Sequence, residues 1–176
     1  MTSYTELITI KVSNYVYGAD AMKNRKRLIA RVILTVLTVT AVAAIFYNSS
    51  RSAVESTEQS SPLTDWINSI LATFPIPFSV TETFIRKLAH FSEYTVLGLL
   101  LNVTVYLYRS DRKKTLLTAL PIGAAVAVCD ELIQLFPAGR SCEVKDMLID
   151  FCGVLFAGLI VYAFISILEK RRIRKG

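Results

Sequence analysis

The chain has 176 residues, the size of one domain, and 53% of them are hydrophobic against only 19% that are charged. With a mean hydropathy of +0.46, it is too apolar for a soluble domain of this length. The net charge of +6 would suit a nucleic-acid partner, but the basic residues form short blocks between apolar runs and lack interleaved aromatic residues. We therefore expect a membrane-embedded protein with no nucleic-acid partner.

The first apolar run covers about residues 28–48 and follows a segment, 1–27, that ends in the basic block Lys23–Arg27. The run is longer than the apolar core of a secretory signal, and no convincing cleavage site follows it. We interpret it as a first transmembrane helix.

Residues 49–85 form a polar connector that contains one predicted helix. Ser61-Pro62 has the pattern of a helix start, with serine as the N-cap and proline in the first turn. Apolar residues at helical spacing follow, and Phe74–Pro77 should end this short helix. It should lie in the membrane interface or pack against the other helices. The capping-box spacing of Ser79–Glu82 predicts the start of the next long helix.

Three further apolar runs cover about residues 86–108, 116–136 and 147–168, and a basic tail, 169–176, closes the chain. The fold class expected is all-α: a polytopic membrane protein with four transmembrane helices plus a short interfacial helix. Residues 28–168 should form the membrane domain. In the fourth run the small residues Gly153 and Ala157 share a face, which should let another helix come close.

The basic residues predict the orientation of these spans. Segments 1–31, 109–114 and 169–176 hold 15 of the 20 Lys and Arg residues. In contrast, ten of the 14 acids lie in the connectors at the other end of the spans or in the adjoining half of the spans. The positive-inside rule makes the first set cytoplasmic, so both termini should be cytoplasmic in a multi-pass protein of the cell membrane.

Polar residues one helical turn apart mark one end of three spans. Arg86, His90 and Glu93 fall within an arc of roughly 60° on a helix. Further polar residues occupy the ends of the next two spans and the turn between them: Asp130, Glu131, Gln134, Arg140, Asp146 and Asp150. In the predicted orientation His90, Asp130 and Asp150 lie in roughly the outer third of a ~30 Å hydrocarbon core. Charges there are tolerated when they face one another, a bound cation or water. We expect the three faces to meet in an outward-facing polar pocket.

Each residue also has a simpler interpretation. His90 could be a hydrogen-bond partner of Glu93 or Asp130 with no acid–base role. Arg140 could be an ordinary loop charge, although its place after a Pro/Gly turn beside acids suits a bidentate clamp for carboxylate or phosphate. Arg86 could anchor the helix at the interface. The odd number of cysteines, without CxxC spacing, indicates neither a zinc site nor a disulfide framework. No catalytic residue can be assigned.

The segment Arg86-Lys-Leu-Ala-His90-Phe-Ser-Glu93-Tyr94, followed by Asp130-Glu131-x-x-Gln134, Arg140 and Asp146-x-x-x-Asp150-x-x-Gly153, resembles the VanZ-like family of bacterial membrane proteins. The Ser- and Gln-containing connector 52–61 is also similar to a segment of that family. The resemblance implies a cell-envelope protein, since the family is named after a teicoplanin-resistance protein and is associated with altered behaviour toward glycopeptide antibiotics. Tyr94, which ends the first of these segments, is also an expected pocket residue. The resemblance implies no reaction.

Three functions remain open on the sequence. The pocket could recognise an outer-leaflet lipid or lipid-linked glycan precursor, with arginines binding phosphate. Alternatively, His90 and the acids could bind Mg²⁺ or Mn²⁺ as the cofactor of a membrane hydrolase or transferase. The polar residues could also serve only to hold the helices or a partner together. We favour lipid recognition. The sequence does not determine the oligomeric state.

Overall fold

The computed structural model describes residues 4–74 and 78–174, with side-chain surroundings from Met22 onward. The regular structure in these residues is entirely helical. It comprises α1 (Tyr4–Ser49), α2 (Ala53–Leu71), α3 (Glu82–Arg109), α4 (Arg112–Ile133) and α5 (Val144–Ile173). Four segments are long and apolar enough to cross a membrane: Met22–Ser49 within α1, and the whole of α3, α4 and α5. The predicted all-α fold with four spans is confirmed.

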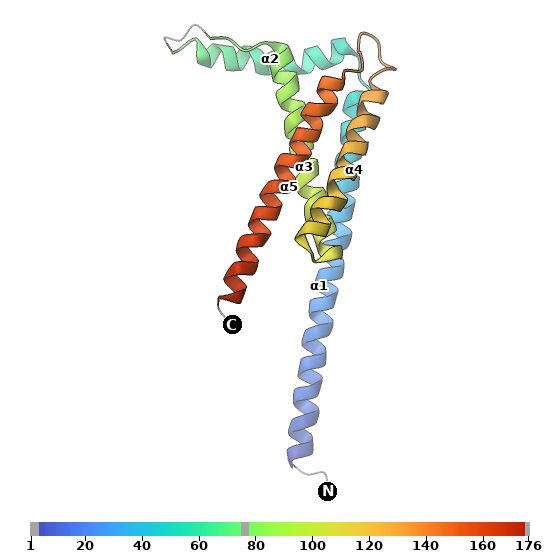
Figure 1. The fold of residues 1–176 in the computed structure, drawn as a ribbon, viewed down its shortest axis with the longest axis vertical. Helices are drawn as coiled ribbons and strands as arrows, with labels where there is room; N and C mark the ends of the chain where they lie inside the picture. Colours follow the sequence, from blue (N-terminus) through green and yellow to red (C-terminus); the bar gives the residue numbers. More distant parts are fainter. Residues whose placement is uncertain (1–3, 75–77, 175–176) are drawn as a thin grey trace.

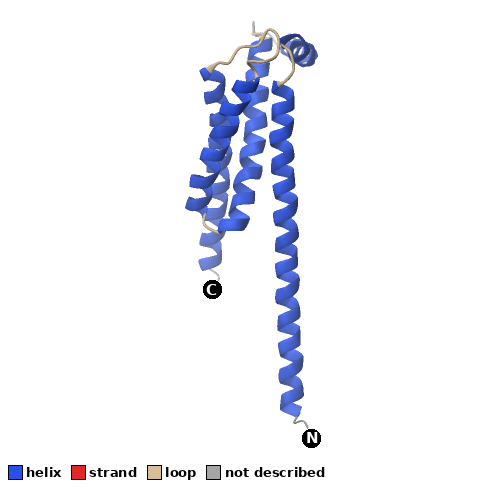
Figure 2. Ribbon diagram, turned by 90° about the vertical axis from the view of Figure 1, so that its right-hand side faces the viewer, coloured by secondary structure: helices blue, strands red, loops and turns tan. Residues whose placement is uncertain are grey.

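The four long helices run side by side, and α2 crosses one end of the bundle (Figures 1 and 2). The turn between α3 and α4, the start of α1 and the end of α5 lie toward the opposite end (Figure 1). There, Arg31 of α1 donates hydrogen bonds of 2.8 and 3.0 Å to the carbonyl oxygen of Leu107, and Arg112 forms an ion pair with Glu169 at 2.7 Å. The basic blocks therefore gather at the end away from α2.

α1 extends further toward the N-terminus than the predicted span, because the polar residues before position 28 continue the same helix. Charged and polar residues exclude this part from lipid but not from a helix, since lysine, arginine and alanine are good helix formers. The apolar portion begins at Leu28, directly after the basic block.

α2 begins earlier than the sequence interpretation placed it. Its N-cap is Ser52, whose hydroxyl accepts the Glu55 N–H, while the Glu55 carboxylate accepts the Ser52 N–H at 2.8 Å. This capping box satisfies two free donors of the first turn. Pro62 therefore lies inside the helix, so the predicted start at Ser61-Pro62 is wrong. The Phe74–Pro77 stop falls partly outside the described residues, and the helix already ends at Leu71.

α3 begins at Glu82, with Thr81 as the N-cap, whose hydroxyl accepts the Phe84 N–H at 3.2 Å. The capping box expected over Ser79–Glu82 is thus also wrong, because the third helical residue is a phenylalanine that cannot return a hydrogen bond. The observed N-cap lies two residues after the predicted one, Ser79, and residue spacing alone cannot distinguish these two helix starts.

The N-terminus of α2 gives a local prediction. Hydrogen bonds to the Ser52 backbone and side chain lower the pKa of Glu55, so the folded state favours its charged form. We expect Ser52→Ala to cost about 1 kcal/mol in the local opening free energy of α2, measured by amide hydrogen exchange of residues 53–57. Because this pKa is lowered on folding, the carboxylate's contribution is present at neutral pH and is lost as the pH falls through the folded-state value. Exchange rates unchanged in the variant would contradict the cap.

α3 and α5 pack closely where α5 carries a glycine. A Cβ atom added at Gly153 would lie 2.6 Å from the backbone oxygen of Phe91 and 3.0 Å from the Thr95 nitrogen. From the other side, a Cβ at Gly98 would lie 2.8 Å from the Cβ of Ala157. The expected close approach to the small face of α5 is confirmed, and the helix that approaches is α3.

Candidate functional site

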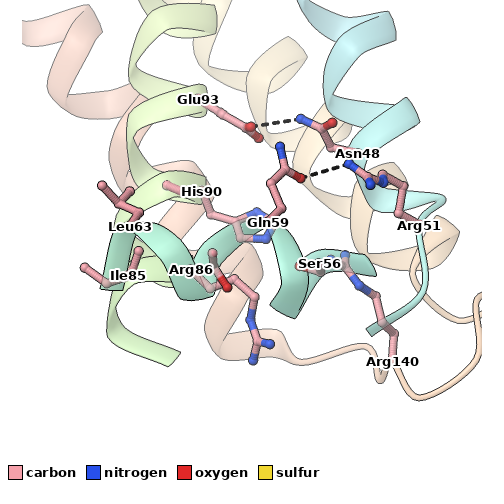
Figure 3. A pocket seen from close by; sticks show the side chains of 12 residues that line it. Asn48, Arg51, Ser56, Gln59, Leu63, Ile85, Arg86, His90, Glu93 and Arg140 are labelled. Atoms are coloured by element: carbon pink, nitrogen blue, oxygen red, sulfur yellow. Dashed lines mark hydrogen bonds between the residues drawn. The ribbon is translucent and has the colours of Figure 1, made fainter. Parts of the chain in front are cut away.

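A polar pocket of about 260 Å³ lies at the α2 end of the bundle. Its walls come from the last turn of α1, one side of α2, the first turns of α3 and the loop between α4 and α5 (Figure 3). The lining residues are Asn48, Arg51, Ser56, Gln59, Ser60, Leu63, Ile85, Arg86, Ala89, His90, Glu93 and Arg140. The arc predicted for Arg86, His90 and Glu93 faces this pocket, and α2 closes over it.

Three guanidinium groups reach this pocket from separate segments (Figure 3). Arg51 donates a 2.9 Å hydrogen bond to the side-chain oxygen of Gln59. Among the described residues, no carboxylate lies within ion-pair distance of Arg51, Arg86 or Arg140. Partial burial, and next the positive charge of Arg86, lower the pKa of Arg140, while Asp130 and Glu131 act in the opposite direction. The guanidinium nevertheless stays charged at neutral pH, so the pocket holds cationic groups that form no direct ion pair with any carboxylate of the described residues.

Glu93 sits on the boundary between this pocket and a second hollow. Its carboxylate accepts a 3.0 Å hydrogen bond from the side-chain nitrogen of Asn48, which joins α3 to α1. Beyond this pair, an apolar hollow of about 360 Å³ lies between α1 and α3. Its other lining residues are Ala41, Ala44, Ile45, Ser92 and Val96. A polar cavity and an apolar hollow thus share Asn48 and Glu93.

A buried cluster joins the three helices beside the polar pocket. One ligand-type atom each from His90, Asp130 and Asp150 lies within 4.8 Å of the other two. The two aspartates are fully buried. The Nδ1 atom of His90 is 3.7 Å from an oxygen of Asp150, which is too long for a hydrogen bond. The three polar faces therefore do converge, with α3, α4 and α5 each contributing one member.

The remaining predicted residues have separate positions. Gln134 is buried, and its side-chain nitrogen lies 3.4 Å from the Ser49 hydroxyl and 3.5 Å from Asp130. Glu131 is fully buried and accepts the Glu143 N–H at 2.8 Å, which ties α4 to the start of α5.

Asp146 forms an ion pair with Lys87, between α5 and α3. Tyr94 is fully buried within the bundle. Four of the predicted residues line the polar pocket: Arg86, His90, Glu93 and Arg140. The other six do not line it: Tyr94, Asp130, Glu131, Gln134, Asp146 and Asp150.

Sequence reasoning missed the half of the pocket that comes from α1 and α2. Asn48, Arg51, Ser56 and Gln59 all line the cavity, yet none was a predicted site residue. The only signal was the similarity of the connector 52–61 to a family segment, because a polar connector is otherwise typical of a solvent-exposed loop.

These features define a polytopic, all-helical membrane protein with a polar pocket and a buried acidic cluster at one end of its spans. The family described as VanZ/LLP1 matches residues 34–166, and the chain belongs to that family. No match was found among curated proteins or among solved structures. The match covers α2, α3 and α4 in full, together with part of the apolar segment of α1 and part of α5.

Proposed function

We propose that the pocket binds the phosphate-bearing head group of an outer-leaflet lipid or lipid-linked glycan precursor of the cell envelope. Arg86 and Arg140 would bind the phosphate, and the hollow between α1 and α3 would receive the first part of the lipid chain. The observation that carries this proposal is the presence in one cavity of guanidinium groups that form no direct ion pair with a carboxylate of the described residues. Guanidinium is suited to phosphate because its fork donates two parallel hydrogen bonds.

The neighbouring apolar hollow supports a lipid over a soluble anion. A free phosphate or sugar phosphate would need only the polar pocket, whereas a lipid needs an apolar path leading from its head group. The two hollows meet at Asn48 and Glu93, and the apolar one is formed by two candidate spans. A ligand with a charged head and a hydrocarbon chain matches both.

The location of the pocket supports an outer-leaflet ligand. It lies at the α2 end, and the basic ends of α1 and α5 lie toward the other end of the bundle. By the positive-inside rule that basic end is cytoplasmic in our proposal, which places both termini inside the cell and the pocket at the outer surface of the cell membrane.

Binding can be measured by calorimetry on purified protein in a non-ionic detergent, with dihexanoyl phosphatidylglycerol and a short-chain polyprenyl phosphate as the two anionic probes. We expect the double variant Arg86→Gln/Arg140→Gln to bind each probe at least about 100-fold more weakly. Each lost charge-assisted hydrogen bond to phosphate is worth about 1.5–3 kcal/mol. Tighter binding of one probe would identify the lipid source.

Two control variants accompany this measurement. Lys145→Gln removes an exposed charge at the same end of the bundle but outside the pocket, and it should leave binding within a few-fold of wild type. Ala44→Phe, which narrows the apolar hollow, should weaken both lipid probes but not glycerol 1-phosphate. Equal affinity of wild type and the arginine variant for the probes would refute the proposal. If Lys145→Gln weakened binding as much as the arginine variant, the binding would reflect general charge attraction instead of a pocket.

Membership of this family extends the proposal to cells. If the bound lipid carries the cell-wall precursor, expression of the chain should change bacterial susceptibility to a glycopeptide antibiotic, and Arg86→Gln/Arg140→Gln should abolish that change at equal protein abundance. A change that persists in the variant would separate the susceptibility effect from the pocket.

A further inference from the structure

The cluster of His90, Asp130 and Asp150 contains polar atoms whose needs the described residues do not meet. Both carboxylate oxygens of Asp150, one oxygen of Asp130 and the Nδ1 atom of His90 are buried and have no hydrogen-bond partner among the described residues. Buried polar side chains are normally paired, and a buried charge without a partner is very unfavourable. Four such atoms from three helices therefore point to a ligand that they share.

The positions of these atoms suit a cation. Donors bound to one metal ion at about 2.0–2.2 Å in tetrahedral geometry lie roughly 3.3–3.6 Å apart. The three donor atoms lie within 4.8 Å of one another, so side-chain movements that shorten the longest separation by about 1 Å would complete such a site. The imidazole–carboxylate spacing of 3.7 Å is already close to that value. Two adjacent buried carboxylates also repel each other unless a positive charge or a proton lies between them.

The donor types select the class of ion. Ca²⁺ takes six to eight oxygen ligands, and Mg²⁺ prefers oxygen ligands and retains its water. One imidazole nitrogen with two carboxylates instead suits a divalent transition metal such as Mn²⁺ or Zn²⁺. Three protein ligands leave at least one coordination position open, as in catalytic sites rather than closed structural ones.

We propose that His90, Asp130 and Asp150 bind a divalent transition-metal ion, Mn²⁺ or Zn²⁺, between α3, α4 and α5. This ion would hold the ends of three helices together beside the polar pocket. His90 is shared by the cluster and the pocket lining, so the metal and a head group in the pocket would be neighbours. The metal site does not depend on the lipid proposal, because each can be tested without the other ligand.

The test uses the full-length protein in detergent, stripped with EDTA and titrated with MnCl₂ or ZnCl₂ alone. Free Mn²⁺ is followed by electron paramagnetic resonance, and bound metal is counted by elemental analysis after gel filtration. We expect one ion per chain and a metal-dependent rise in Tm. Asp150→Asn should weaken binding more than about 100-fold, which exceeds the 10–100-fold cost of losing an outer-shell partner, and it should abolish the rise in Tm.

The control is Asp146→Asn, which makes the same change one turn earlier on α5, at a residue paired with Lys87 outside the cluster. It should bind metal within a few-fold of wild type. Asp130→Asn provides an independent second loss-of-binding variant if Asp150→Asn does not fold. Absence of a stoichiometric ion at millimolar Mn²⁺ and Zn²⁺, or equal weakening by the control, would overturn the proposal. If no ion binds but the lipid probes still bind in EDTA, the metal proposal is overturned while the lipid proposal stands.

Discussion

Replacing Gly153 by alanine should destabilise the bundle by about 3 kcal/mol and lower its Tm by about 5–10 °C. The added Cβ would lie 2.6 Å from the Phe91 oxygen and 3.0 Å from the Thr95 nitrogen. Both are backbone atoms of α3, which no side-chain rotation can move away, so the two helices would have to separate. This loss would occur although alanine is intrinsically the better helix former by about 1 kcal/mol.

Gly158→Ala is the matched control on the same helix. Its Cβ would also meet a close atom, at 2.7 Å, but that atom is the Cδ1 of Leu116, which rotation about the side-chain bonds can displace. We expect a change of less than about 1 kcal/mol. Thermal unfolding of both variants in one detergent checks the comparison. Equal Tm values for the two would show that helix separation is not what limits stability here.

The second large effect is expected at Glu131, on the link between α4 and α5. Its carboxylate accepts the N–H of Glu143, the N-cap residue of α5, which has no side-chain cap of its own. Glu131→Ala would remove this acceptor and leave a cavity at a fully buried position. We expect a loss of about 3 kcal/mol or more in the free energy of unfolding.

Glu131→Gln distinguishes the hydrogen bond from the charge. The amide oxygen can still accept the Glu143 N–H, so this variant should retain most of the stability. Chemical unfolding gives the free energies, and hydrogen exchange at residues 143–146 reports the start of α5. Equal losses for the alanine and glutamine variants would mean that the negative charge, rather than the acceptor oxygen, stabilises this link.

Local sequence patterns predicted the elements that depend on neighbouring residues. Arg86, His90 and Glu93 lie on one face because helical geometry places them there, and the structure puts all three in the pocket lining. The small residues of α5 indicated a close helix contact for a similarly local reason. Helix starts were less predictable: both Ser61-Pro62 and Ser79 have the residue types of a cap, but Ser52 and Thr81 make the hydrogen bonds.

The long-range pairings could not be predicted from such patterns. Asp146 and Asp150 share a face of α5, yet Asp146 pairs with Lys87 while Asp150 joins the buried cluster. The two aspartates lie one helical turn apart along α5, and this difference in position decides which partners each one meets. Similarly, Gln59 enters the pocket because α2 crosses the bundle there, and no periodicity in the connector indicates that direction.

The sequence by itself determined the number of spans and the end at which the polar residues gather, because hydrophobic length and helical periodicity are properties of contiguous segments. The tertiary structure alone decided which polar groups meet. Helix rotation and the path of α2 set those contacts, and both result from packing between residues far apart in the chain. The arginine pocket and the buried cluster of His90, Asp130 and Asp150 are therefore visible only in three dimensions.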